Sequence, residues 1–370
     1  MTAHDIVGGV VWVQALVLMA AIGFAVFEML FVVSGGRRHF LTRRRLSIVA
    51  CSSVVVGLLA LPLMGPLASS INVTDAILAQ YLKGNLRGMT AMEMQAMVDM
   101  RMTLVDDLAR GASWLGLALI AVFSAAALAR LAYLALNLSR IRAALQGSCT
   151  LRKTARLHLM ASPHVKVPFS TRGLRRYIVV LPADVCHDPI AMRMYLGHEL
   201  QHIRQGDVDT EILLSVVSPL FVLNPGFWYV AGRVRNLSEL ACDRAYLSRQ
   251  RVGARDYSLR LLATARSHLA ARRSGPTAFG VPFIGRALPW RSRRSILKSR
   301  IEEIAADLEE TPREGLWLAG AASLAMICVI LVVAAAVGGS GDWSHERIML
   351  STVVNLERID ALNTLAQRSW

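Results

Sequence analysis

Two histidines lie four residues apart in Gly197-His198-Glu199-Leu200-Gln201-His202, with a glutamate directly after the first. On a helix, residues four apart lie on one face, so both imidazoles can reach the same metal ion. A carboxylate between them can take a proton from water that a metal activates. The spacing therefore predicts a catalytic zinc site, with His198 and His202 as ligands and Glu199 as the general base.

A catalytic zinc ion takes a third protein ligand, and an acidic pair downstream can supply it. Glu239 and Asp243 are four residues apart and share a helix face. One carboxylate can bind the metal while the other accepts a hydrogen bond from a ligand imidazole. We predict Glu239 as the ligand. The five cysteines lack paired metal-type spacing, so neither a cysteine zinc site nor a disulfide framework is expected.

Apolar residues make up 54% of the 370-residue chain and gather in long blocks. Four blocks exceed the roughly 20 residues that cross a bilayer. We predict four membrane spans, at residues 6–34, 47–70, 112–138 and 315–338. Asp5 is the only formal charge before the first block, so that block lacks the basic start of a signal peptide and is expected to be retained.

The loops between the predicted spans differ in charge. Five arginines and no acid occupy the first loop: Arg37, Arg38, Arg43, Arg44 and Arg45. The second loop, about residues 71–111, mixes both signs. Residues 139–314 carry 28 Lys and Arg against 15 Asp and Glu. By the positive-inside rule, the first loop and residues 139–314 are cytoplasmic, while both termini, including the tail 339–370, lie outside.

Residues 139–314 are predicted to form an α+β domain dominated by helices. The apolar run at 177–181 before Pro182 predicts a strand, and 165–169 could form an edge strand. Helical patterns begin at Pro189 and cover 228–250 and the segment after Ser295. The basic stretch 271–294 contains Pro and Gly, so it is expected to be a loop, and it is a weak candidate for self-cleavage.

Several polar residues have more than one interpretation. Glu28 and Arg130 lie inside predicted spans, where each either extends to the interface or pairs with the other. The arginines at 286–300 are expected to face anionic lipid, since they lack the aromatic interleaving typical of nucleic-acid binding. Tyr229 and Tyr257 are candidates for polarising a substrate. The other seven histidines have no ligand spacing.

These motifs together resemble those of the BlaR/MecR-type membrane metallopeptidases, the antirepressor proteases of inducible antibiotic resistance and their relatives. The resemblance rests on segments 198–207, Asn224-Pro225 followed by Trp228, segment 239–243 and segment 297–304, and it extends to about residue 338. It implies a mainly α membrane protein with a zincin-like (gluzincin) domain between spans 3 and 4. The implied roles are zinc ligands for His198, His202 and Glu239, catalytic base for Glu199, and supporting roles for Asp207 and Asp243.

One departure from this family concerns the sensor. About thirty residues follow Gly338, without a Ser-x-x-Lys motif, so no penicillin-binding sensor domain is expected. The leading hypothesis is a zinc endopeptidase of the bacterial inner membrane that cuts a cytoplasmic protein, for which a winged-helix repressor is one candidate. A constitutive quality-control protease and a non-proteolytic zinc-containing receptor are the alternatives. No direct contact with nucleic acid is expected, and the sequence leaves the oligomeric state open.

Overall fold

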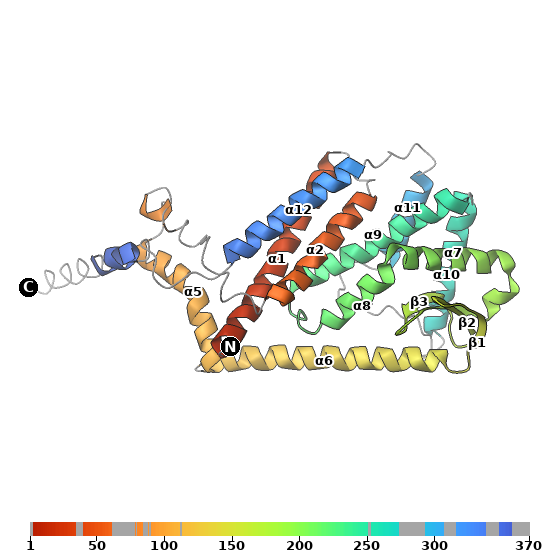
Figure 1. Ribbon diagram of the computed structural model, residues 1–370, viewed down its shortest axis with the longest axis horizontal. Helices are drawn as coiled ribbons and strands as arrows, with labels where there is room; N and C mark the ends of the chain where they lie inside the picture. Colours follow the sequence, from red (N-terminus) through yellow and green to blue (C-terminus); the bar gives the residue numbers. More distant parts are fainter. Residues whose placement is uncertain are drawn as a thin grey trace, which may run out of the picture. The chain divides into compact units, whose positions relative to one another are not determined.

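Most of the described residues are helical in the computed structural model, and they include one four-stranded sheet (Figure 1). The structure describes residues 3–34, 40–60, 78, 80–83, 88, 90–111, 113–250, 253–273, 293–306, 316–337 and 348–356. The chain divides into two compact units. One comprises Met1–Gly23, Val49–Phe123 and Leu324–Trp370, and the other comprises Phe24–Ile48 and Ser124–Ser323. The second unit contains every residue predicted for the metal site.

Two of the described helices are long and apolar enough to cross a membrane. Helix α1 (Ala3–Val33) contains the apolar segment Ile6–Val33, and helix α6 spans Trp114–Leu145. Only 33% of the α1 window and 11% of the α6 window are buried within the protein, so both present apolar side chains outward, as lipid contact requires. They coincide with the first and third predicted spans.

The other two predicted spans match helices whose described residues are not both long and apolar enough to cross a membrane. Helix α2 (Phe40–Ala60) covers the start of the second span, and positions 61–70 lie outside the described residues. Helix α12 (Leu316–Val337) contains a shorter apolar stretch, Gly320–Val332. The four-span arrangement and its orientation therefore remain predictions.

The two predicted loops contain helical residues. Arg43, Arg44 and Arg45 lie in the first turns of α2, not in a loop before it. Helix α5 (Ala91–Arg110) occupies the second loop and begins with a capping box. In this box the Thr90 hydroxyl accepts from the Glu93 amide at 3.2 Å, and the Glu93 carboxylate accepts from the Thr90 amide at 2.9 Å. The bounds of the apolar blocks determined these loop assignments, and hydropathy does not detect helix caps.

The sheet has the order β1-β2-β4-β3, with strands Cys149–Lys153, Leu157–Ser162, Phe169–Arg172 and Tyr177–Pro182 for β1 to β4. The β2–β4 pair is parallel, whereas the β1–β2 and β3–β4 pairs are antiparallel. Strand β4 was predicted. The edge strand predicted at 165–169 lies further along the chain: β3 is an edge strand and begins at Phe169, directly after a proline that cannot donate to a ladder, while Val165 forms only an isolated bridge.

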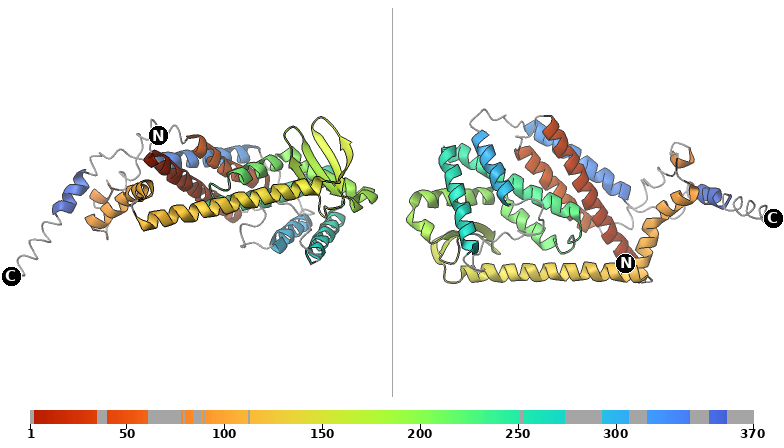
Figure 2. Two further views of the ribbon diagram at one scale, coloured as in Figure 1. Left: turned by 90° about the horizontal axis from the view of Figure 1, so that it is seen from below. Right: turned by 180° about the vertical axis from the view of Figure 1, so that it is seen from behind.

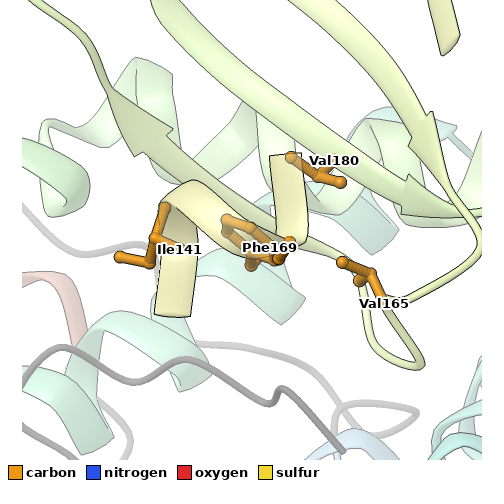
Figure 3. Close-up of a cluster of buried hydrophobic side chains, with 5 residues drawn as sticks. Ile141, Val165, Phe169 and Val180 are labelled. Carbon is orange, nitrogen blue, oxygen red and sulfur yellow. The ribbon is translucent and has the colours of Figure 1, made fainter. Parts of the chain in front are cut away.

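Strand β4 is buried on both faces, which explains its unbroken apolar sequence. On one face, Val180 packs with Phe169, Val165 and Ile141, and Ile141 belongs to the end of α6 (Figure 3). On the opposite face, Val179 and the residues around it pack against helix α7 (Pro189–Gln205). Figure 2 shows the sheet beside the end of α6 in both further views. The sheet therefore lies between α6 and the helix that carries both histidines.

Capping residues set the ends of the helices that bear the site. Asp188 follows the short helix η3 (Asp184–His187) and accepts from the amides of Ile190 and Ala191 at 2.9 and 3.0 Å, which starts α7. Gly206 ends α7 with a φ of 73°, a left-handed conformation that favours glycine, and α8 follows at once.

The remaining helices of this unit are α8 (Asp207–Val217), α9 (Pro225–Gln250), α10 (Ala254–Arg273) and α11 (Arg293–Ala306).

The helices predicted from Pro189 and over 228–250 are confirmed, and α9 starts three residues earlier than predicted because Asn224 caps it through the Phe227 amide. Helix α10 extends to Arg273, into the stretch predicted as a loop. Positions 274–292, which hold most of the candidate self-cleavage segment, lie outside the described residues.

The hypothesis of a Glu28–Arg130 pair is wrong. Glu28 forms ion pairs with Arg43 of α2 and Arg233 of α9. Arg130 instead donates from Nε to the Ser218 hydroxyl at 2.8 Å, and its guanidinium lies 5.1 Å from the Trp228 ring centroid. A carboxylate within an apolar helix needs compensating charge, and here two arginines provide it.

Candidate metal centre

His198 and His202 direct the same ring atom toward each other. Their Nε2 atoms are 3.1 Å apart, and the rings are nearly perpendicular, with an interplanar angle of 86°. Two nitrogens bound tetrahedrally to zinc at about 2.0–2.1 Å would be separated by roughly 3.3 Å. The pair is therefore already arranged as two ligands of one tetrahedral ion.

Glu239 completes the set of predicted ligands from helix α9. Its Oε1 lies 3.7 Å from Nε2 of His202, and its Oε2 lies 3.8 Å from Nε2 of His198. Burial raises the pKa of this carboxyl, but the charges of Arg300 and then His202 outweigh burial and lower it to about 2. Glu239 is therefore ionised at neutral pH, the form in which a carboxylate binds zinc.

Cys242 is a second candidate for the third ligand, because suitable atoms of His198, His202 and Cys242 lie within 4.8 Å of one another. Its sulfur lies 3.5 Å from Nδ1 of His198, on the opposite edge of the ring from Nε2, and also donates to the His198 carbonyl. Burial raises the pKa of the thiol to about 11, whereas zinc binds the thiolate. Glu239 fits better on both charge and position.

Gly197 allows the histidine helix to approach its neighbours closely. A β-carbon at this position would overlap the ring of Tyr246, which is buried in α9. Glycine is therefore required by packing here, one residue before His198. The contact sets how near α7 lies to α9 and hence how near the histidines lie to Glu239.

The far nitrogen of His202 is held by an aspartate. Nδ1 of His202 donates to Oδ2 of Asp207 at 2.8 Å. The other oxygen, Oδ1, accepts from the Ser238 hydroxyl at 2.8 Å and from the guanidinium of Arg44. Arg44 also donates to the Gln205 carbonyl at 2.7 Å. Such a hydrogen bond fixes the tautomer of the imidazole and leaves Nε2 as the metal-binding atom.

The far nitrogen of His198 reaches an aspartate through a tyrosine. Nδ1 of His198 lies 3.1 Å from the Tyr257 hydroxyl, which donates to Oδ1 of Asp243 at 2.7 Å. Asp243 accepts two further bonds of 2.6 Å from Nε and Nη2 of Arg300. The same guanidinium lies 2.8 Å from Glu239 through Nη1. Burial and then Asp243 raise the pKa of Tyr257, so its hydroxyl keeps the proton that it donates.

The two histidines have opposite pKa shifts. Burial, followed by the charge of His202, lowers the pKa of His198 to about 4, so this ring is neutral at physiological pH. Burial also opposes the charged form of His202, but the hydrogen bond to Asp207 and the charge of Glu239 raise its pKa well above the ordinary value. A neutral ring is the form that binds zinc, so a metal bound at His202 would displace a proton.

Glu199 is buried beside the histidines on α7, with 9% of its surface exposed. Burial raises its pKa, against the opposing effects of the His202 charge and a hydrogen bond from Ser170 of strand β3. A carboxyl with a raised pKa accepts a proton more readily, as a general base must. Strand β3, at the edge of the sheet, contacts helix α7 and in this way also reaches the site.

A comparison with known families identifies the chain. The profile described as BlaR1 peptidase M56 matches residues 54–281, more than half of the sequence. The chain belongs to the M56 peptidase family. It is also 30% identical over 103 residues to the regulatory protein BlaR1 of Bacillus licheniformis. That alignment covers 26% of this chain and 17% of the relative.

The matched M56 region contains all the predicted site residues, and the structure brings His198, Glu199, His202 and Glu239 together, with Asp207 and Asp243 behind the histidines. The two tyrosines proposed to polarise a substrate have other contacts. Tyr229 donates to Glu28 at 3.2 Å, and Tyr257 lies on the Nδ1 side of His198.

The two arginines behind the aspartates were not predicted from the sequence. Arg44 was assigned to the topology signal and Arg300 to a basic stretch facing lipid, but 8% of Arg44 is exposed and the Arg300 side chain is 14% exposed. Both lie outside the M56 match. The sequence did contain an indication for Arg300, because this residue belongs to one of the segments that carry the family resemblance. Arg44 had none, since its partner lies 163 residues away.

Proposed function

We propose that this protein is a zinc endopeptidase of the bacterial inner membrane that cleaves a cytoplasmic protein in a signalling pathway. A transcriptional repressor is the substrate that we favour. The observation that carries the enzymatic part is the convergence of two Nε2 atoms, 3.1 Å apart, with a charged glutamate facing both. Membership of a peptidase family supports hydrolysis of a peptide bond. The similarity to a regulatory protein supports a role in signalling.

Nε2 of His198, Nε2 of His202 and the carboxylate of Glu239 would hold the metal. A zinc ion bound there supplies a Lewis acid and makes water nucleophilic near neutral pH. Asp207 and the Tyr257–Asp243 pair keep a proton on each Nδ1, which directs both Nε2 atoms toward the ion. Three protein ligands leave a fourth position for the reaction, as catalytic zinc sites require.

Glu199 acts as the base in this proposal. Its carboxylate takes a proton as the water oxygen bonds to the peptide carbon, and it then gives the proton to the amide nitrogen as the carbon–nitrogen bond breaks. The raised pKa of the buried carboxyl matches both transfers. Glu199 precedes the metal ligand His202 by three residues, so it can face the site without joining the ligand set.

The first test compares Glu199→Gln with the wild-type protein, purified in detergent and assayed with the proteins of the host cytoplasm. Removing a general base typically lowers the rate roughly 10²- to 10⁴-fold, so new protein N-termini should nearly disappear while bound zinc stays stoichiometric. Mass spectrometry of N-termini identifies the substrate without prior choice. Equal sets of fragments from both proteins would contradict the proposal.

The second test assigns the metal ligands. We expect His198→Ala with His202→Ala to abolish zinc binding, and Glu239→Ala to weaken it strongly. Cys242→Ala is the matched comparison on the same helix, and it should retain zinc. If Cys242→Ala lost the metal and Glu239→Ala kept it, the cysteine would be the third ligand.

The third test concerns orientation. Fusions of alkaline phosphatase or a fluorescent protein after Gly147 and after Ser344 report which side of the membrane each position faces. We expect fluorescence at Gly147 and phosphatase activity at Ser344, because the basic residues concentrate in 139–314. An active phosphatase at Gly147 would place the peptidase domain outside and exclude a cytoplasmic substrate.

A further inference from the structure

Arg44 belongs to the run of arginines at the start of α2, yet it differs from its neighbour Arg45 in its surroundings. Arg44 is 8% exposed, whereas Arg45 is exposed. The positive-inside rule requires only that such residues stay on one side of the membrane, and it gives no reason to bury one of them. A buried guanidinium loses its hydration and is retained where it makes several hydrogen bonds.

The bonds of Arg44 join three helices of the metal centre. Nη2 donates to the carbonyl of Gln205, in the last turn of α7, at 2.7 Å. Nε and Nη2 donate to Oδ1 of Asp207, the first residue of α8. Nε also donates to the Ser238 hydroxyl of α9, 3.2 Å away and one residue before Glu239. A planar guanidinium with fixed donor directions suits such a junction.

These contacts determine the position of Asp207. Oδ1 is occupied by Arg44 and Ser238, which leaves Oδ2 to accept from Nδ1 of His202 at 2.8 Å. Without the arginine, the charge of the buried Asp207 carboxylate would be balanced by His202 alone, and only the Ser238 hydroxyl would still bond Oδ1. Arg44 thus acts on His202 through Asp207 and on Glu239 through the neighbouring Ser238.

We propose that Arg44 is a positioning residue of the metal centre, supplied from the helix that follows the first predicted span. It holds Asp207, and thereby His202 and the α7–α9 spacing, in the geometry that binds the metal. This proposal rests on the proposed zinc site. It also adds a residue of α2 to the site. Most of α2 lies outside the M56 match, whereas the predicted ligands lie within it.

The test uses the full-length protein in detergent, with Arg44→Gln, Arg44→Lys, Asp207→Asn and the control Arg45→Gln. Zinc affinity is measured by competition with a chelator, and thermal unfolding is measured on metal-free protein. Changes behind a metal ligand typically lower metal affinity roughly 10- to 100-fold. We expect that loss for Arg44→Gln, an intermediate loss for Arg44→Lys, and no loss for Arg45→Gln.

Two further readouts separate positioning from simple stabilisation. The losses caused by Arg44→Gln and Asp207→Asn should not add in the double variant, because both act through one contact. Cobalt-substituted protein should show shifted absorption bands in Arg44→Gln, since those bands report ligand geometry.

Each outcome decides the proposal. If Arg44→Gln lowered only the unfolding temperature and kept the affinity and cobalt spectrum of Arg45→Gln, the positioning role would be excluded. Should Arg44→Gln fail to fold, Arg44→Lys and Asp207→Asn carry the same comparison. A wild-type protein that binds no zinc would overturn the proposed function as well, whereas normal zinc binding in every Arg44 variant would overturn this inference alone.

Discussion

The two histidines of the metal centre are supported from behind in different ways. On one side, Nδ1 of His202 bonds directly to Asp207, which is held by Arg44. On the other side, the Tyr257 hydroxyl lies 3.1 Å from Nδ1 of His198 and donates to Asp243, whose Oδ1 is 3.6 Å from the same Nδ1, and Asp243 is held by Arg300. Each aspartate is thus held by an arginine from a helix distant in sequence. Only at His198 does a neutral hydroxyl also contact the imidazole.

The arginines differ in a second respect. Arg44 bonds to one carboxylate, a hydroxyl and a backbone carbonyl, whereas Arg300 binds two carboxylates, Asp243 and the predicted ligand Glu239. Arg300 therefore balances more buried charge, while Arg44 joins more helices. We therefore expect the loss of a positive charge to reduce stability most on the His198 side. The loss of fixed hydrogen-bond directions should reduce metal affinity most on the His202 side.

The largest effect is expected for Arg300→Gln. This change leaves the buried Asp243 and the partly buried Glu239 without their cation, and breaking a buried pair typically costs about 3 to 5 kcal/mol. Chemical denaturation of the metal-free protein should show the loss. Lys298→Gln, an exposed residue of the same helix, is the control. Equal stability of the two variants would mean that the charges around Asp243 are balanced by other groups.

Asp207→Asn and Tyr257→Phe compare the two imidazole supports directly. Asp207→Asn removes the carboxylate that holds His202 and should lower zinc affinity roughly 10- to 100-fold. Tyr257→Phe removes one neutral hydrogen-bond partner, worth about 1 kcal/mol, so the loss should stay near or below tenfold. Competition with a chelator measures both. The reverse order would show that the tyrosine is the more important support.

Ser170→Ala tests the base and leaves both imidazole supports intact. The Ser170 hydrogen bond favours the charged form of Glu199, so its removal should raise the pKa of that carboxyl further. A base must be deprotonated, and activity is lost as the pH falls through its pKa. The acid limb of kcat/KM should therefore move to higher pH, and an unmoved or lower limb would separate Ser170 from the base.

The smallest effect is expected for Arg172→Gln. Arg172 of β3 lies 2.6 Å from Asp209 of α8, two residues after Asp207, but both side chains are solvent-exposed. Exposed pairs contribute little, because water and salt screen them. Zinc affinity and the unfolding temperature should match wild type. A loss of zinc affinity comparable to that of Arg44→Gln would show that the exposed contact of α8, and not the buried bonds of Arg44, positions Asp207.

The grouping of His198, His202 and Glu239 could be predicted because it depends on local spacing. His198 and His202 are one helical turn apart, and Glu239 shares a helix face with Asp243, so each pair defines a face before any tertiary contact is known. Strand β4 was also predictable, since burial on both faces leaves a continuous apolar run.

The parts that were not predicted depend on long-range packing. All five residues of β1 are exposed, so the strand has no apolar pattern that could reveal it. Arg44 has neighbours of the same type, and only its contacts with Asp207 and Ser238 distinguish it from Arg45. Glu28 could be identified as needing a cation, but which arginines it contacts depends on how α1, α2 and α9 pack.

The distance along the chain between Arg44 and Asp207 also has a consequence for synthesis. Bacterial and eukaryotic ribosomes add about 5 to 20 residues per second, so the 163 residues between them take roughly 10 to 30 seconds to make. During that time Arg44 lacks Asp207, the carboxylate that it bonds in the folded protein. Arg300 emerges 57 residues after Asp243. The peptidase centre is thus completed only when most of the chain has left the ribosome.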